Sequence, residues 1–262
     1  MVEREIPEHG FPLHCRFSRI QLIMGIDYDF RWSLLWEDPY GGWLIDALLV
    51  TVHLALLSWL FALAIGIVIA VFRVSPVKWL RIIGTSYVEV LRNIPFLVQL
   101  FFWYFAVPTL LPRAWMLWWN QLPSANYWTA VVALSIYTST RVTEQIRSGI
   151  HATPNGQYQA GLSIGLSYPQ MYRYVILPYA IRVMIPSMTS EFLTIFKNTA
   201  FAMVITVPEI TFTAKRIENW TFQGIEAYTF ASLVYVLTTF SVIAFMGWVE
   251  RRLHIPGMIK KE

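Results

Sequence analysis

The sequence predicts an all-α protein that crosses a membrane several times, and three observations lead to this fold class. Hydrophobic residues make up 56% of the 262 residues and charged residues only 14%, whereas soluble domains carry roughly 25% charged residues. The mean hydropathy is +0.49. Five apolar runs reach the roughly 20 residues that a helix needs to cross a bilayer. We therefore expect a polytopic integral membrane protein with five transmembrane helices.

The expected spans follow one another along residues 44–249, which form the predicted transmembrane domain. They cover residues 44–72, 87–107, 127–146, 181–207 and 228–249. Basic residues gather directly after the first and the fifth span: Arg73, Lys78, Arg81, Arg251 and Arg252. Cytoplasmic flanks carry an excess of Lys and Arg. We therefore expect a cytoplasmic C-terminal tail at 250–262 and a periplasmic N-terminal segment at 1–43.

The N-terminal segment is polar and mildly acidic. It lacks the basic stretch and apolar core of a cleavable signal peptide. Two interpretations of residues 1–23 stay open: an upstream extension, with Met24 as the true start, or a genuine N-terminal tail.

The sequence carries no motif for chemistry of its own. Its single cysteine, Cys15, excludes an internal disulfide framework. The five histidines are scattered, and no two sit at metal-ligand spacing on one expected helix. There is no phosphate-binding glycine motif and no nucleophile elbow. We therefore expect no enzyme activity, no metal site and no cofactor in this chain.

The polar connector between the third and fourth spans has the start and stop signals of two short helices that meet at an elbow. Thr153 can cap the first helix with Pro154 at its first position, where a missing N–H costs nothing. Gly165 can end that helix, because glycine accepts the left-handed conformation such ends require. Ser167 and Gln170 have the spacing of a capping box for the second helix. On pattern alone, an ordinary structured connection explains the stretch equally well.

The second and third spans carry polar residues towards their expected cytoplasmic ends. In the second, Glu89 and Arg92 lie three residues apart and can form an ion pair, while Gln99, seven residues past Arg92, shares its helix face. An ion pair with a helix kink at Pro95 explains the same residues without a substrate.

In the third span, Thr138, Arg141 and Gln145 recur at intervals of three and four residues, with Glu144 beside them. Charged residues at membrane depth face a bundle interior or water.

The fourth span has the longest polar stripe. Ser187, Glu191, Thr194 and Asn198 follow at spacings of four, three and four residues, and Lys197 widens the stripe. Because a lipid-facing Glu or Lys is costly at mid-membrane, the stripe faces a partner subunit, an internal ion pair or a water-filled path. A solute path or its gate and a structural polar interface remain equally open.

Residues 153–178 also resemble the EAA loop, the signature of permease subunits of bacterial ABC importers. Gln159-Ala160-Gly161 is followed four residues later by Gly165, and Leu177-Pro178 closes the stretch. The chain departs from the family pattern, which has Glu at position 159 and Ala at 161, so a salt bridge from the first position is in doubt. In that family the loop is the cytoplasmic coupling helix, which docks in a cleft of the ATPase subunit. The resemblance implies a coupling role for Gln159, Ala160, Gly161, Gly165, Leu177 and Pro178.

Further stretches resemble the polar amino-acid permeases of the histidine/glutamine/glutamate type, and within that group most closely the glutamate/aspartate permeases. They are residues 84–104, 172–191 and 250–257. If the chain moves a solute, as this resemblance implies, polar residues of the spans become candidates for the substrate pathway: Arg92, Gln99, Arg141, Glu144, Glu191, Thr194, Lys197 and Asn198.

The resemblance implies an importer of the bacterial inner membrane that works by alternating access. A periplasmic binding protein delivers the amino acid, and a dimer of separate ATPase subunits binds ATP and Mg. A second permease subunit, either another copy or a homologous chain, completes the pathway. The bilayer is the remaining partner, and no nucleic acid is expected.

The external segment 208–227 lies where the family's binding protein docks. Two interpretations of its charged residues stay open: they are ordinary exposed residues, or they help to dock a partner. These residues are Glu209, Lys215, Arg216, Glu218 and Glu226.

Three other functions stay open. The chain can be an importer permease for another polar amino acid, a subunit of an ion-driven secondary transporter or channel, or a non-transporting scaffold or receptor. The elbow and the absence of an internal repeat argue against the ion-driven class. The stripe around Glu191 argues against the scaffold.

Overall fold

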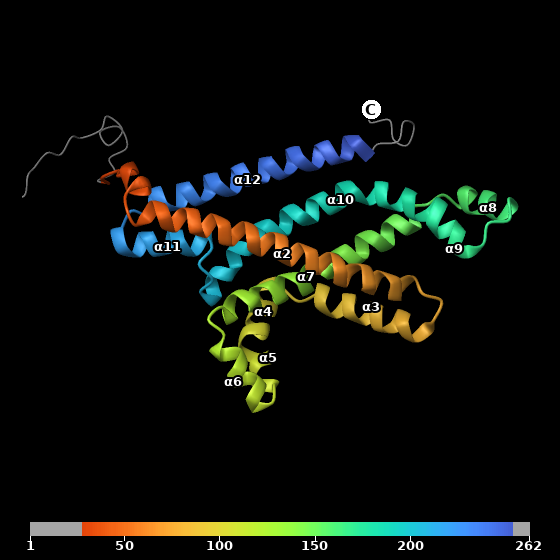
Figure 1. The fold of residues 1–262 in the computed structure, drawn as a ribbon, viewed down its shortest axis with the longest axis horizontal. Coiled ribbons are helices and arrows are strands. Elements are labelled where there is room, and N and C mark those ends of the chain that lie inside the picture. The colour runs from red at the N-terminus through yellow and green to blue at the C-terminus, as the bar shows by residue number, and fades with distance from the viewer. Residues whose placement is uncertain (1–27, 254–262) are drawn as a thin grey trace, which may run out of the picture.

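The structure is a computed structural model that describes residues 28–253. The expectations for residues 1–23, for Met24 and for residues 254–262 of the tail lie outside this range. The described chain folds into helices without strands (Figure 1), as the all-α class predicts. In chain order the elements are η1 (Trp32–Trp36), α2 (Tyr40–Val74), α3 (Lys78–Arg92), α4 (Phe96–Phe101), η2 (Phe102–Ala106), α5 (Val107–Leu110), α6 (Arg113–Gln121), α7 (Ala125–His151), α8 (Asn155–Ser163), α9 (Tyr168–Met171), η3 (Tyr172–Ile176), α10 (Leu177–Asn198), η4 (Thr199–Ile205), α11 (Ile210–Thr221) and α12 (Gly224–Leu253).

The helices α2 and α7 pack against each other at the centre of the fold. The buried face of α2 consists largely of small residues at spacings of three or four: Thr51, Ala55, Ser58, Ala62, Gly66 and Ala70. A Cβ atom at Gly66 would lie 2.5 Å from Cγ1 of Val142 on α7. The two backbones therefore come this close only because Gly66 has no side chain. The Thr143 hydroxyl donates to the Gly66 carbonyl at 3.2 Å across the same contact.

The second expected span is not one straight helix. It is broken between α3 and α4, and the helical stretches on the two sides of the break are bent by 104°. Pro95 explains the position of the break, because it lacks a backbone N–H and biases the preceding residue away from helical geometry.

Gln99 on α4 holds this bend together. Its buried side-chain amide donates to the carbonyls of Leu91 at 2.6 Å and of Ile94 at 3.1 Å. Because α3 ends at Arg92, these carbonyls have no donor from a following helical turn. The expectation that Arg92 and Gln99 share a helix face is wrong, because the bend separates them. The expected ion pair of Glu89 with Arg92 is also wrong: within residues 28–253 no ion pair joins them, and both are exposed.

Two elements, η2 and η3, are π-helical turns. Each ends two residues before a proline, Pro108 in the first case and Pro178 in the second. A proline leaves the carbonyl four residues earlier without its usual donor, and a π-turn is one way in which a helix accommodates this.

Two described helices can cross a membrane unbroken by length and hydropathy, Tyr40–Val74 and Gly224–Val249. They contain the first and the fifth expected spans. Two pairs of helices, each bent at a short break, are also long and apolar enough to cross a membrane if each pair counts as one span. They are Lys78–Arg92 with Phe96–Leu110, and Tyr168–Ile205 with Ile210–Thr221, the second pair bent by 45°. The helix α7, which holds the third expected span, is long enough but not apolar enough to meet these criteria, because its second half is polar. Two to four spans are supported in this way, and five transmembrane helices remain a prediction.

The two ends of the bundle are built differently (Figure 1). At one end η1, α11 and the first turns of α12 share an apolar cluster that includes Leu34, Leu44, Ile210 and Ile217. At the other end lie α8 and α9, while α4, α5 and α6 project from the side of the body. The polar connector is thus at the end of the molecule opposite η1.

Candidate functional site

The polar connector folds into α8 and α9 with an elbow at Gly165. Gly165 has a φ of +77°. The amide of Leu166 donates to the carbonyl of Gly161 at 3.1 Å, and the amide of Gly165 donates to that of Leu162 at 3.0 Å. These two bonds form a Schellman motif, which satisfies the last carbonyls of α8. The prediction that Gly165 ends the first helix is confirmed.

The capping prediction is right for the second helix and wrong for the first. The Ser167 amide donates to Oε1 of Gln170 at 2.8 Å and the Ser167 hydroxyl accepts from the Gln170 amide, which together form the expected capping box; the hydroxyl also donates to the same Oε1 at 2.8 Å. Pro154, with an extended ψ of 136°, is the cap residue of α8, so the helix begins one residue later than expected. The Thr153 hydroxyl is buried and has no hydrogen-bond partner in the described part of the chain.

The six predicted coupling residues differ in exposure. Gln159, Ala160 and Gly165 are exposed on α8 and the elbow, Leu177 is 41% exposed, and Pro178 is partly buried. Gly161 is buried, and a Cβ atom there would lie 2.5 Å from Cε of Met171 on α9. Gly161 therefore permits the close packing of α8 on α9, while its exposed neighbours are free to meet a partner.

Sequence reasoning missed a set of exposed apolar side chains on the same surface, which we call the elbow patch. It consists of Leu162 (45% exposed), Ile164 (77%), Tyr168 (65%) and Tyr174 (63%). The hydroxyl of Tyr168 also raises the pKa of the neighbouring Tyr158. Exposed apolar patches mark protein or membrane contacts. The signal for this patch in the sequence is apolar residues within an otherwise polar connector.

Two predicted pathway residues meet between α7 and α10. Nη1 of Arg141 lies 3.8 Å from Oε2 of Glu191. Nη2 of Arg141 donates to the Tyr137 hydroxyl at 2.8 Å. The Glu191 side chain is 13% exposed, and its buried Oε2 accepts no hydrogen bond within the described residues. This carboxylate is therefore charge-paired and still has room for a donor.

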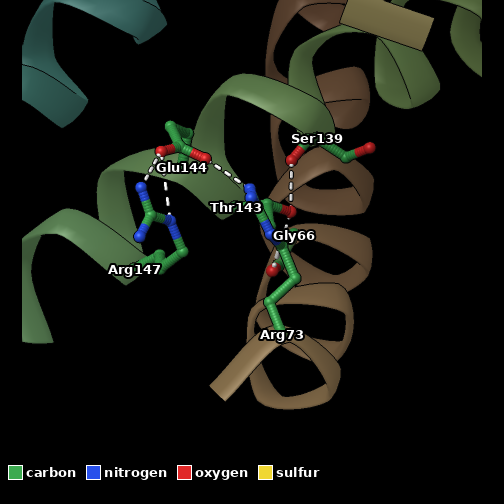
Figure 2. A network of polar contacts seen from close by, with 6 residues as sticks. All are labelled: Gly66, Arg73, Ser139, Thr143, Glu144 and Arg147. Carbon is green, nitrogen blue, oxygen red and sulfur yellow. Dashed lines mark hydrogen bonds and ion pairs between the residues drawn. The ribbon is translucent and has the colours of Figure 1, made fainter. Parts of the chain in front are cut away.

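A third predicted residue, Glu144, is the centre of an ion-pair network (Figure 2). Nε and Nη2 of Arg147, on the same helix, donate to its Oε1 at 3.1 and 2.5 Å. Its other oxygen, Oε2, accepts from Nη1 of Arg73 at the end of α2. The Arg73 side chain is only 10% exposed. Glu144 therefore ties the end of α2 to α7, and sequence reasoning had placed Arg73 only as a charged flank.

The remaining pathway candidates are not gathered at one point. Arg92 is exposed at the end of α3, and Gln99 is committed to the bend. The Thr194 hydroxyl donates to the Ser190 carbonyl of its own helix at 2.8 Å. Lys197 is exposed on the last turn of α10, which ends at Asn198.

Two of the charges expected to be exposed in the segment 208–227 are buried. Glu209 caps α11 by accepting from the amides of Thr211 at 2.8 Å and Phe212 at 2.7 Å. Glu226 accepts from the Arg31 amide at 2.7 Å and the Tyr28 hydroxyl at 2.5 Å. The expectation was wrong for both, because backbone donors at helix starts hold carboxylates inside.

The remaining charges of this segment are at its surface. Lys215 and Glu218 form an ion pair at 2.9 Å, with exposed fractions of 49% and 32%. The guanidinium of Arg216 lies 3.7 Å from the ring centre of Trp43.

Over residues 28–253 the fold is all-helical, with two unbroken apolar helices of membrane length, partly buried ion pairs between helices and an elbow loop at one end, which is the architecture of a helical membrane protein. The chain belongs to the family of binding-protein-dependent transport system inner membrane components, whose family model matches residues 62–255. It is similar to the glutamate/aspartate import permease protein GltJ of Escherichia coli (strain K12), with 35% identity over 87% of this chain and 97% of the relative. It is also 33% identical to the probable glutamine ABC transporter permease protein GlnM of Bacillus subtilis (strain 168), over 72% of this chain and 83% of the relative.

The fold is similar to a solved structure described as an amino acid ABC transporter with histidines. The TM-score is 0.74 and the identity 30%, over 87% of this chain and all of that chain. The chain is therefore an amino-acid ABC transporter permease.

Proposed function

We propose that this permease imports glutamate or aspartate across the bacterial inner membrane as part of an ATP-driven complex. The observation that carries the proposal is the 35% identity to GltJ, a glutamate/aspartate import permease by name, over 97% of its length. An anionic side chain on the substrate calls for a cationic partner. Arg141 on α7, which pairs with Glu191 of the stripe, and Lys197 on α10 are the candidates for that role.

The coupling role belongs in this proposal to α8, the elbow and α9. A partner ATPase dimer would hold ATP and Mg, and this chain would hold no cofactor. The elbow patch supports docking, because Ile164 and Tyr168 are exposed and apolar although they lie in a polar connector at the end of the molecule. The capping box and the Schellman motif satisfy the backbone groups on both sides of the elbow, which supports a rigid connection through which motion would reach α10.

A second permease, another copy or a homologous chain, would cover the apolar face that this chain leaves open. Only 6% of the most apolar stretch of α12 is buried within the chain. In this arrangement Glu191, Thr194, Lys197 and Asn198 on α10 line the pathway between two subunits. A periplasmic binding protein would deliver the amino acid at the end formed by η1 and α11.

A second candidate is import of glutamine, which the 33% identity to GlnM favours. Uptake by the reconstituted complex separates the two. We expect ATP-dependent accumulation of labelled glutamate and aspartate, with unlabelled glutamine a poor competitor. Accumulation of glutamine alone would favour the second candidate, and uptake without ATP would support an ion-driven transporter instead.

The matched variants are Arg141→Gln and Arg113→Gln. Arg141 pairs with Glu191 of the stripe, whereas Arg113 is exposed at the start of α6 and has no ion pair or side-chain hydrogen bond among residues 28–253. We expect the first variant to reduce glutamate uptake by about tenfold, the effect of one charge-assisted contact, and the second to leave it near the wild-type rate. Equal rates in both variants would remove Arg141 from the substrate pathway.

A further inference from the structure

A cavity that is separate from the Arg141–Glu191 pair lies beside η3, the turn that follows α9. It has a volume of about 400 Å³ and is formed by the end of α2, the start of α3, the last turns of α7 and η3. Small-ligand pockets typically have volumes of roughly 300 to 1,000 Å³. Polar side chains line much of it, among them Arg73, Arg81, Arg147, His151, Tyr172 and Ser75.

The cavity carries more positive charge than the protein neutralises. Arg73 and Arg147 share one carboxylate, that of Glu144. Arg81 has neither an ion pair nor a side-chain hydrogen bond among residues 28–253. Three guanidinium groups against one carboxylate leave two positive charges at the cavity. Like charges that line one cavity repel each other, and an anion bound among them relieves this repulsion.

The start of α3 adds to this excess. Helix N-termini carry a positive partial charge and favour acidic residues, yet the first turn of α3 contains Lys78 and Arg81 and no acidic residue. The Ser75 hydroxyl, just before this helix, accepts from the Val77 amide at 3.2 Å, so its own O–H remains available as a donor. Cations and a hydroxyl thus meet where an anion would be stabilised.

We propose that this cavity binds a phosphate group. A guanidinium matches the planar pairs of oxygens that phosphate offers and binds them with two parallel hydrogen bonds. The headgroup of an acidic phospholipid and free phosphate present the same chemistry, and basic pockets between membrane helices are known to take lipid headgroups. A bound phosphate would connect α2, α3 and α7 to η3. The proposal does not depend on which amino acid the permease transports.

Binding of two probes to the purified full-length permease complex tests the proposal. The probes are inorganic phosphate and short-chain dihexanoyl-phosphatidylglycerol, with neutral monoacylglycerol as the blank, and the readout is titration with native mass spectrometry. The test variant is Arg81→Gln. The Arg81 side chain lines the cavity, and its replacement breaks no ion pair or side-chain hydrogen bond among residues 28–253. The matched control is Lys78→Gln, which removes the same charge from the same exposed helical turn but does not line the cavity.

We expect Arg81→Gln to weaken binding of the phosphate-bearing probe by about tenfold, the loss of one charge-assisted contact, and Lys78→Gln to leave it within about twofold. Tighter binding of the lipid than of inorganic phosphate would identify the source as a headgroup. Equal binding would identify free phosphate. No saturable binding of either probe, or equal losses in both variants, would overturn the proposal. Because these readouts are binding constants, they do not change if the proposed substrate is wrong.

Discussion

At the scale of single residues, Glu144 shows how charge is accommodated next to an apolar bundle. Its two oxygens accept from Arg147 on its own helix and from Arg73 at the end of α2. Removing charges from water is costly, and only paired and hydrogen-bonded charges offset that cost. Since the Arg73 side chain is 10% exposed, it depends on Glu144 more than the half-exposed partners of surface pairs depend on each other.

We predict that Glu144→Gln destabilises the protein by about 2 kcal/mol, because Arg73 then remains partly buried without a counter-charge. The measurement is thermal unfolding of the purified protein in detergent, where the change corresponds to a fall in Tm of roughly 5 °C. The control is Glu218→Gln, which breaks the exposed pair with Lys215 and should leave Tm unchanged. Equal melting temperatures for wild type and Glu144→Gln would show that the network does not hold α2 to α7.

At the scale of elements, the contact between α2 and α7 depends on the small residues of α2 rather than on large apolar side chains. Lipid tails are as apolar as leucine, so close packing and hydrogen bonds hold membrane helices together. At Gly66 an added Cβ atom would lie 2.5 Å from Cγ1 of Val142. The Thr143 hydroxyl donates to the Gly66 carbonyl at the same contact (Figure 2). A larger side chain there must separate the helices.

Gly66→Val is expected to cost about 2 to 3 kcal/mol through overpacking, seen as a lower Tm and a lower yield of folded protein. Gly42→Ala in the same helix is the matched control. No atom lies within 4 Å of the Cβ it would add, so it should stabilise the helix by up to about 1 kcal/mol. If Gly66→Val melts at the wild-type temperature, the helices are not in contact at this residue.

The elements that the sequence predicts correctly are those with local causes. Gly165 and the Ser167–Gln170 capping box lie within a few residues of the groups that they satisfy, so their spacing is visible in the chain. Pro95 predicts a kink, but the 104° bend depends on Gln99 reaching back to Leu91. Thr153 shows the limit of local signals, because the extended backbone of Pro154 moves the helix start by one residue.

The contacts that the sequence did not predict join distant segments. Arg73 and Glu144 are 71 residues apart, and Tyr28 and Glu226 are 198 apart. A single sequence contains no spacing that connects such pairs. For the same reason the burial of Glu209 and Glu226 was missed, since their surroundings come from other helices. The elbow patch was missed for another reason: its apolar residues alternate with polar ones and follow no helical period.

At the scale of the whole molecule, the two ends of the bundle suit different partners. The end with η1 and α11 buries the carboxylates of Glu209 and Glu226, while the elbow patch is exposed on the elements at the opposite end, α8, α9 and the residues next to them (Figure 1). Basic residues lie at the elbow end of α2 and α3. By the positive-inside rule we predict that the elbow lies in the cytoplasm.

This topology predicts opposite accessibility for two engineered cysteines in a Cys15→Ser background. Ser124→Cys, before α7, should react with a membrane-impermeant maleimide in right-side-out spheroplasts. Asn155→Cys, at the start of α8, should react only after lysis. Both positions are exposed, so burial does not explain a difference. Labelling of both from the same side would contradict five spans with the N-terminus outside.

If the elbow couples this permease to an ATPase, as we propose, a change at the elbow must alter amino-acid-stimulated ATP hydrolysis. The purified complex would be compared as wild type, Ile164→Asp and Leu110→Asp, which place the same charge at sites that are 77% and 75% exposed; Leu110 ends α5, on the side of the body and away from both ends. We predict that Ile164→Asp still folds but loses at least tenfold in ATPase binding and stimulated hydrolysis, the size of a hot-spot loss, while Leu110→Asp retains both. Unchanged stimulation in Ile164→Asp would contradict the account and leave the elbow as an ordinary connector.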